Sequence, residues 1–272
     1  MKKIYVRPMS LSYGLDAYNL IKIKKALPIC GNKKLAFSNI EIIYREKKIK
    51  KKNIYITQLQ KLPKKVKKSV LKKIKNITSK RKKISGLDFD KFNIFGVLNM
   101  TPDSFSDGGK FNKLKLAEMH SKKMINDGAN FIDIGGESTR PGAKLISSEK
   151  EKQRVLPIIS KMKKYNISID TRKSDVMLAA IKKGANIIND VSALDFDQNS
   201  LAVVSKLQKP VILNHSQGTP DIMQNNPKYQ NVLLDIYDYF ENKINQLTKR
   251  KFLRKNIILD PGIGFGKNLN HN

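Results

Sequence analysis

Short apolar runs alternate with amphipathic stretches along the second half of the chain. The runs are typical of buried strands and lie at residues 94–98, 131–134, 167–169, 187–188, 211–213 and 257–259. The stretches between them carry helix signals, such as Ser148 followed three residues later by Glu151, which predicts a capping box. Strands that alternate with helices predict right-handed βαβ units around a parallel sheet. This pattern alone allows either a barrel or a doubly wound sheet.

A polar residue lies at or just past the end of each apolar run. These residues are Asn99, Asp133, Asp170, Asn189, Asn214 with His215, and Asp260. A doubly wound sheet gathers ligand residues mainly at one switch point, whereas a barrel collects them from every strand at one mouth. Consecutive polar strand ends therefore favour an α/β fold of the TIM (β/α)8 type, which we place at residues 92–272.

The first third of the chain has weaker signals. Residues 1–46 contain a possible helix at 16–25 and a strand-like run at 40–44, which predicts a small N-terminal α+β extension. Residues 47–91 are interpreted as a lysine-rich linker that is partly helical, because Val66, Val70 and Ile74 fall at helical spacing.

The chain is strongly basic, with 54 Lys and Arg against 23 Asp and Glu and a net charge of +31. Such an excess can indicate a nucleic-acid partner. Much of it is concentrated in residues 45–83, where nearly all the cations are lysines and Tyr55 is the one aromatic residue. Because arginines for bidentate contacts and aromatics for stacking are so few, we expect a solvated segment and no nucleic acid. A nucleic-acid-binding module on this segment remains an alternative.

The single cysteine, Cys30, excludes an intrachain disulfide and favours a reducing compartment. No apolar stretch approaches the ~18 residues that a membrane span needs, and the N-terminus lacks the apolar region of a signal peptide. The sequence therefore predicts a cytoplasmic protein with no membrane partner.

A glycine-rich segment at residues 262–267 ends in Lys267, as a phosphate-binding loop does. Pro261 stands where such a loop has its first glycine, and Asn268 follows the lysine where Ser or Thr is needed. The segment therefore does not predict a nucleotide site.

Six segments in order resemble the motifs of dihydropteroate synthases, which are pteridine-binding TIM barrels. The segments are 99–109, 132–143, 168–171, 187–190, 215–218 and 259–267. The resemblance implies a transferase of folate biosynthesis that condenses 7,8-dihydropterin-6-ylmethyl diphosphate with 4-aminobenzoate and releases diphosphate. A pterin-dependent methyltransferase of the same barrel superfamily is a less favoured alternative, because it is not expected to carry both of the first two motifs.

The resemblance also implies roles for individual residues. Asn99 matches the ligand of the Mg²⁺ that neutralises the leaving diphosphate, and an amide oxygen is a suitable hard ligand. Asp170, Asn189 and Asp260 match the residues that bind the pterin ring. Asp170 would also stabilise the cationic pterin-methyl species formed as diphosphate departs. His215 is expected to be structural.

The two loops that follow the first two strands are implied to cover the site. Phe105 and Pro141 match the walls of the aminobenzoate pocket, and Thr139 matches a contact to the substrate diphosphate. Asp107 and Arg140 match residues that support the closed, water-excluding arrangement.

Two further family motifs, after the seventh and eighth strands, have no match in these 272 residues. We therefore expect an incomplete barrel of about six βα units, against the eight of the complete fold. The open alternatives are a truncated, catalytically impaired pterin-binding chain and one half of a split enzyme. A homodimer or a complementing C-terminal chain is accordingly a possible partner.

Overall fold

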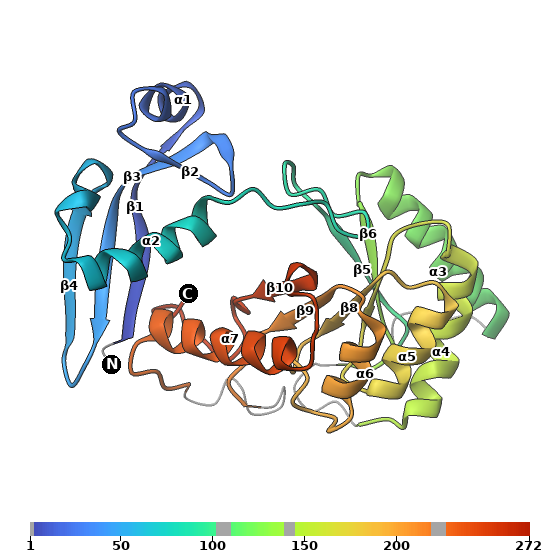
Figure 1. Ribbon diagram of the computed structural model, residues 1–272. Helices are drawn as coiled ribbons and strands as arrows, with labels where there is room; N and C mark the ends of the chain where they lie inside the picture. Colours follow the sequence, from blue (N-terminus) through green and yellow to red (C-terminus); the bar gives the residue numbers. More distant parts are fainter. Residues whose placement is uncertain (1–2, 102–109, 139–144, 219–226) are drawn as a thin grey trace. The chain divides into compact units, whose positions relative to one another are not determined.

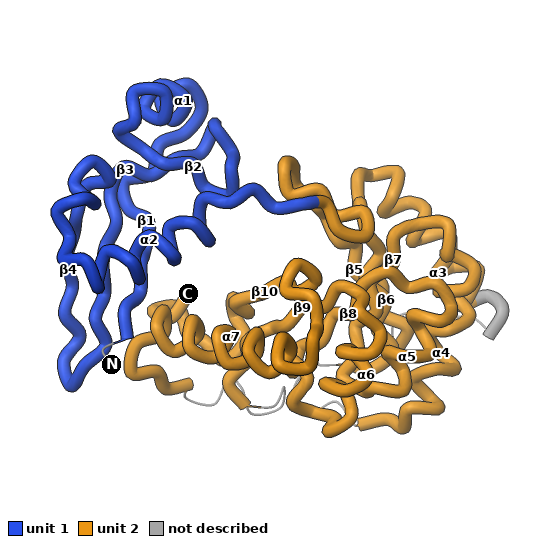
Figure 2. The backbone as a smooth tube through the Cα atoms, viewed as in Figure 1, with its two compact units in different colours: residues 1–82 blue, residues 83–272 orange. Residues whose placement is uncertain are grey.

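The computed structural model describes residues 3–101, 110–138, 145–218 and 227–272. The chain divides into two compact units, Met1–Lys82 and Lys83–Asn272 (Figure 2). The division differs from the predicted boundaries, since residues 47–82 belong to the first unit rather than to a linker.

Unit 1 is an antiparallel sheet with two α-helices. Its central strand β3 pairs with β1, β2 and β4. The elements are β1 (Lys3–Tyr13), α1 (Gly14–Lys22), β2 (Leu27–Ile29), β3 (Asn32–Arg45), β4 (Ile49–Tyr55), the 3₁₀ helix η1 (Ile56–Lys61) and α2 (Lys64–Thr78).

The lysine-rich segment folds because it keeps an apolar residue at each position that faces the unit's interior. On α2, Val70 and Ile74 are buried, and the predicted helical spacing is confirmed. They pack with Ile40 and Ile42 of β3 and with Ile54 of β4. Most of the lysines of α2 are exposed, so the basic composition of this segment reflects the solvent-facing side of the helix.

Unit 2 contains six parallel strands in sequential order, β5 to β10 (Figure 1). All six predicted strands are confirmed. The strands are β5 (Phe95–Asn99), β6 (Phe131–Gly135), β7 (Ile167–Asp170), β8 (Ile187–Asp190), β9 (Val211–Asn214) and β10 (Ile257–Asp260). The helices between them are α3 (Lys110–Asn126), α4 (Ser148–Met162), α5 (Ser174–Lys183), α6 (Ser200–Leu207) and α7 (Val232–Lys249), with a 3₁₀ turn η3 (Arg254–Asn256).

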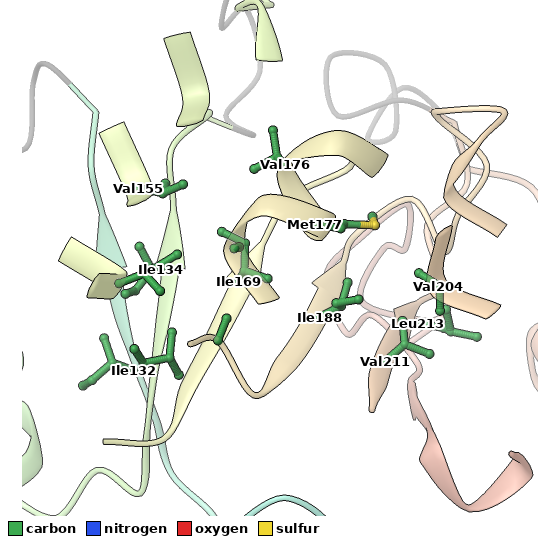
Figure 3. Packing of buried hydrophobic residues seen from close by; sticks show 14 of the residues in the cluster. Ile132, Ile134, Val155, Ile169, Val176, Met177, Ile188, Val204, Val211 and Leu213 are labelled. Carbon is green, nitrogen blue, oxygen red and sulfur yellow. The ribbon is translucent and has the colours of Figure 1, made fainter. Parts of the chain in front are cut away.

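Successive side chains of a strand point to opposite faces of the sheet. The two faces of this sheet carry different kinds of side chains. On one face Ile134, Ile169 and Ile188 are fully buried against the helices, with Val155 of α4 and Met177 of α5 among their neighbours (Figure 3). The other face begins with a layer of apolar residues at the amino ends of the strands: Phe95, Phe131, Ile187, Ile212 and Ile258, together with Leu87. Polar residues follow this layer toward the carboxyl ends.

The start of α4 differs from the prediction. The N-cap is Ser147, whose side chain accepts a hydrogen bond from the backbone N–H of Lys150. Glu151 does not complete a capping box, because its carboxylate is fully buried and accepts a hydrogen bond from Lys173 at 2.6 Å. A tertiary ion pair therefore replaces the local contact that the sequence predicted.

Candidate active site

The polar strand ends form a row across the sheet. Asn99 is aligned with Gly135, Gly135 with Asp170, and Asp170 with Asn189. Further along, Asn214 is aligned with Asp260. Because parallel strands present their carboxyl ends at one edge, residues from β5 to β10 reach the same side of the fold.

Gly135 carries no side chain in the middle of this row, and polar atoms of its neighbours lie over it. A Cβ atom built on Gly135 would lie 3.3 Å from Oδ2 of Asp170 and 3.5 Å from Oδ1 of Asn99. The two oxygens therefore face a common point over the glycine. A side chain at this position would occupy the space between the predicted metal ligand and the predicted pterin contact.

One layer below, Asp133 contacts Asn189 directly. The side-chain amide of Asn189 donates a hydrogen bond from Nδ2 to Oδ2 of Asp133 at 2.9 Å. Asp133 is only 8% exposed. Burial raises the pKa of Asp133, and the neighbouring Ser168 hydroxyl and Asn189 amide lower it in part.

Asp170 lies in a strongly acidic environment. Burial raises the pKa of Asp170 well above its usual value, and the charges of Asp133 and Asp190 raise it further. Arg172 opposes them by favouring the charged form. The site therefore disfavours a negative charge on Asp170 until hydrogen-bond donors or a positive charge arrive.

A buried ion network supports the strand ends beside this row. Glu137, two residues after β6, accepts hydrogen bonds from Arg172 at 2.8 Å and from Lys173 at 2.9 Å. Lys173 also donates to Glu151. Although burial raises the pKa of Glu137, these hydrogen bonds outweigh it and hold the pKa below its usual value. The backbone N–H of Ile146 donates to the same carboxylate at 3.2 Å, so Glu137 joins the segments on either side of residues 139–144.

The ring of His215 is buried and contacts neighbouring side chains. Its Nδ1 lies 3.0 Å from Nζ of Lys267, and its ring packs edge-on against Tyr239. Burial and the charge of Lys267 lower the pKa of His215 to about 4. Lys267 donates to backbone carbonyls of its own glycine-rich segment, including those of Gly262 and Phe265. The lysine is therefore turned into the protein, which agrees with the rejection of a nucleotide-binding loop.

Asp260 is the last residue of β10, at the same edge of the sheet as the row, and it precedes the glycine-rich segment. Its Oδ1 accepts a hydrogen bond from the backbone N–H of Gly262 at 2.8 Å. Gly262 has a positive φ of 64°, and a Cβ there would lie 2.1 Å from the carbonyl oxygen of His215. Only glycine fits this turn, which leads the chain away from Asp260.

Of the predicted site residues, Asn99, Asp170 and Asn189 lie in the row, and Asp260 lies two residues beyond the β10 position that is aligned with it. The others fall outside the described residues: Phe105, Asp107, Thr139, Arg140 and Pro141. Sequence reasoning noted Asp133 as a polar strand end but gave it no role in the site. It did not predict the buried contacts of Glu137 and Lys267, because their partners lie up to 52 positions away in the sequence.

Within the described part of the chain, no group of three or more His, Cys, Asp or Glu residues is arranged to bind a metal ion. Among the same residues, no helix combines the length and the apolar character needed to cross a membrane.

Comparisons with known proteins agree with this site. A family model described as "Pterin binding enzyme" matches residues 95–272. The chain belongs to this family. A dihydropteroate synthase of Escherichia coli K12 is 44% identical over 191 residues, which cover 69% of this chain and 67% of the relative. The chain thus spans about two thirds of the length of this relative.

Solved structures of the family also match. The Yersinia pestis dihydropteroate synthase in a sulfonamide drug complex aligns with a TM-score of 0.63 and 41% identity, covering 68% of each chain. A Xanthomonas albilineans dihydropteroate synthase with 4-aminobenzoic acid aligns with a TM-score of 0.62 and 37% identity, covering 68% of this chain and 67% of that one. The predicted resemblance and the predicted α/β barrel class are therefore confirmed.

Proposed function

We propose that the chain carries out the dihydropteroate synthase reaction: it joins 7,8-dihydropterin-6-ylmethyl diphosphate to 4-aminobenzoate and releases diphosphate. The observation that carries the proposal is the row of Asn99, Gly135, Asp170 and Asn189 across four adjacent strands. The row combines amide and carboxylate oxygens that approach one another over a glycine. Relatives that bind 4-aminobenzoic acid, 7,8-dihydropteroate or pteroic acid support the assignment of substrates.

The pterin ring is the ligand that suits the acidic part of the row. A pterin presents an amino group and ring N–H donors on one edge, and carboxylates accept such bonds well. We assign Asp170, Asn189 and Asp260 to this edge. The raised pKa of Asp170 supports the assignment, because bound donors compensate the burial and the negative neighbours that raise it.

The same residues also favour the chemical step. As diphosphate leaves, positive charge develops on the pterin-methyl group, and a preorganised carboxylate stabilises that charge more than the neutral ground state. Asp170 has this role in our proposal. The amine of 4-aminobenzoate then attacks the methylene carbon and loses a proton. His215 takes no part as a base, because its Nδ1 faces Lys267.

The described residues fit a Mg²⁺ ion with one protein ligand. Oδ1 of Asn99 lies over Gly135, and Asn99 itself is exposed at the strand end. Mg²⁺ prefers a few oxygen ligands together with substrate phosphates and several waters, so a site without an acidic cluster suits it. When bound, the ion would neutralise charge on the leaving diphosphate.

The loop residues keep the roles that the resemblance gives them. We propose that Phe105 and Pro141 wall the aminobenzoate pocket, that Thr139 contacts the diphosphate, and that Asp107 and Arg140 support loop closure. A contact between described residues supports this proposal: the backbone N–H of Ile146 donates a hydrogen bond to the carboxylate of Glu137.

The state of assembly is part of the proposal. Within the described residues, β5 and β10 are the edge strands of the parallel sheet. Val97 of β5 is 59% exposed and Leu259 of β10 is 40% exposed. A complementing chain that supplies further strands would pair with these edges and cover these side chains; a homodimer is the alternative arrangement. Sedimentation of the purified chain, alone and with candidate partners, distinguishes the two.

The reaction is tested by measuring diphosphate release from the pterin diphosphate in the presence and absence of 4-aminobenzoate. Calorimetric titration of the 272-residue chain with the pterin diphosphate measures binding separately from turnover. We expect binding that Asp170→Asn weakens, and release that depends on 4-aminobenzoate. Binding without release would assign the chain to the pterin-binding, catalytically impaired alternative. Absence of both would contradict the proposed function.

A further inference from the structure

The Asp133 carboxylate occupies an unusual place on the inner face of the sheet. It lies on β6 between the apolar layer that contains Phe131 and the row of polar strand ends. It is almost completely buried, and its Oδ2 is bonded to the Asn189 amide. Its other oxygen, Oδ1, is also buried and has no hydrogen-bond partner within the described part of the chain.

The hydrogen bond fixes which end of the Asn189 amide faces the pocket. An ionised carboxylate can only accept hydrogen bonds, so it holds the NH₂ end of the amide. The carbonyl oxygen of Asn189 is then directed away from Asp133. Without this partner, the terminal torsion of an asparagine side chain has two broad and nearly equivalent orientations. The amide could then present a donor where an acceptor is required.

We propose that Asp133 is a positioning residue, which holds the Asn189 amide so that its carbonyl oxygen, beside the Asp170 carboxylate, accepts from the donor edge of the pterin. Asp133 itself does not touch the ligand. This inference rests on the proposed pterin-binding function and assigns a residue that the family resemblance left without a role.

The stability of the fold gives no reason for a carboxylate at this position. Burying a carboxylate is unfavourable, and burial outweighs the favourable contacts of Asp133 with Ser168 and Asn189 in raising its pKa. Apolar residues already pack together on this face, and one of them, Ile187, is in register with Asp133 across β7, so an apolar residue is compatible with this position. Asp133 also adds negative charge next to Asp170, which makes the empty site less stable. A residue that destabilises the fold in two ways is typical of a functional site.

The test is a double-mutant cycle on pterin binding. The dissociation constant for 7,8-dihydropterin-6-ylmethyl diphosphate is measured by calorimetry for wild type, Asp133→Ala, Asn189→Ala and the double variant. Asp133→Ala should weaken binding roughly tenfold, the value of one hydrogen bond to a charged or oriented group. In the Asn189→Ala background the same substitution should have almost no effect, because Asp133 acts through Asn189.

Two further variants separate positioning from a general effect on the fold. Asp133→Asn keeps an acceptor for the Asn189 amide and should restore binding to within roughly threefold of wild type. Asp197→Ala is the matched control, since Asp197 accepts backbone hydrogen bonds from Ser174 and Asn199 away from the row. It should lower thermal stability and leave the dissociation constant unchanged. Asp133→Val, which matches the apolar layer, repeats the test if the alanine variant folds poorly.

The possible results distinguish this inference from the function on which it rests. If wild type binds no pterin, the proposed function fails. If wild type binds and Asp133→Ala binds equally well, the positioning role is wrong. Equal losses from Asp133→Ala in both backgrounds would also overturn it, because Asp133 would then act independently of Asn189.

Discussion

The ammonium nitrogen of Lys267 lies 3.0 Å from Nδ1 of His215 and donates to the carbonyl oxygens of His215, Gly262 and Phe265. These contacts join the end of β9 to the glycine-rich segment after β10. The segment begins directly after Asp260, so a buried lysine sets the direction in which the chain leaves the row of polar strand ends. Lysine is suited to this position because its ammonium has donors for several acceptors at once.

Lys267→Met should therefore destabilise unit 2. It removes the donor from three buried carbonyl oxygens and from His215, and we expect the free energy of unfolding to fall by about 2–4 kcal/mol. Pterin affinity should fall as well, because the turn after Asp260 loses its support. Chemical denaturation and calorimetric titration measure the two effects. Lys255→Met, at an exposed lysine in η3, is the control and should change neither. An unchanged denaturation midpoint for Lys267→Met would contradict the structural role.

His215 should make the fold sensitive to mild acid. Its pKa is lowered to about 4 in the folded chain, whereas the unfolded value is close to 6.5. The unfolded state therefore binds more protons between these values, and stability falls as the pH drops from 6.5 toward 4. The loss amounts to roughly 2–3 kcal/mol. His215→Asn should flatten the dependence of the unfolding free energy on pH in this window. The same slope in wild type and variant would exclude His215 as its source.

The strand ends of unit 2 could be predicted because the signal is local. Each strand is a short apolar run, and the parallel arrangement brings the next polar residue to a common edge. The pairing of Asp133 with Asn189 could not be predicted in this way, because the residues are 56 positions apart and alternation alone does not identify which polar groups bond. For the same reason the sequence did not predict that Glu151 pairs with Lys173 instead of completing a capping box.

Unit 1 shows a different limit of sequence reasoning. The lysines of β4 are exposed in a strand whose single buried residue is Ile54. So little apolar alternation does not distinguish a strand from a linker. The strand forms because β3 offers a long apolar partner: Ile54 is aligned with Ile40, and Lys52 with Ile42. Long-range antiparallel pairing, rather than local propensity, determines this part of the fold.

Gly135→Ala tests the glycine position in the row. Gly135 has no strained backbone angle, and its Cβ would meet Asp170 and Asn99 oxygens at ordinary to tight distances, so the variant should fold. We expect weaker binding of the pterin diphosphate and of Mg²⁺ in its presence, by roughly tenfold. Gly96→Ala is the control on the adjacent strand, where a Cβ would lie 2.8 Å from the Met124 sulfur. It should reduce stability without changing affinity. If Gly96→Ala weakened binding and Gly135→Ala did not, the ligand would have to bind away from Gly135.

Asp170→Asn should separate stability from binding. The folded-state pKa of Asp170 is raised by burial and by Asp133, so ionisation of Asp170 destabilises the folded state as the pH rises through that pKa. A neutral amide removes this effect. The variant should unfold at a higher temperature than wild type at pH 8 and at a similar temperature at pH 4, while pterin affinity falls. Thermal scans at both pH values, each with and without the pterin diphosphate, measure the difference. A lower unfolding temperature at pH 8 would show that the charge of Asp170 stabilises the empty site.

The first turn of α2 offers a prediction about the basic character of unit 1. Residues 1–82 contain 25 Lys and Arg against three Asp and Glu, a net charge of +22. Helix α2 begins at Lys64 without an acidic residue in its first turn and without a side-chain cap on its N-cap residue Pro63. Cations at a helix N-terminus oppose the helix dipole. Lys64→Glu reverses that interaction and adds an i,i+4 pair with Lys68, so we expect α2 to gain about 0.5–1 kcal/mol.

The matched control for this change is Lys75→Glu, in the last turn of the same helix. At that end of the helix the native lysine interacts favourably with the helix dipole. The same charge reversal therefore reduces the repulsion among the many cations of unit 1 but loses this favourable interaction. Its gain should be smaller than that of Lys64→Glu. Hydrogen exchange of the α2 amides in the full chain measures both. Raising the salt concentration to 1 M should reduce the difference between the variants, since the Debye length falls to about 3 Å. Equal effects at low salt would mean that net charge, rather than the position along the helix, limits the stability of α2.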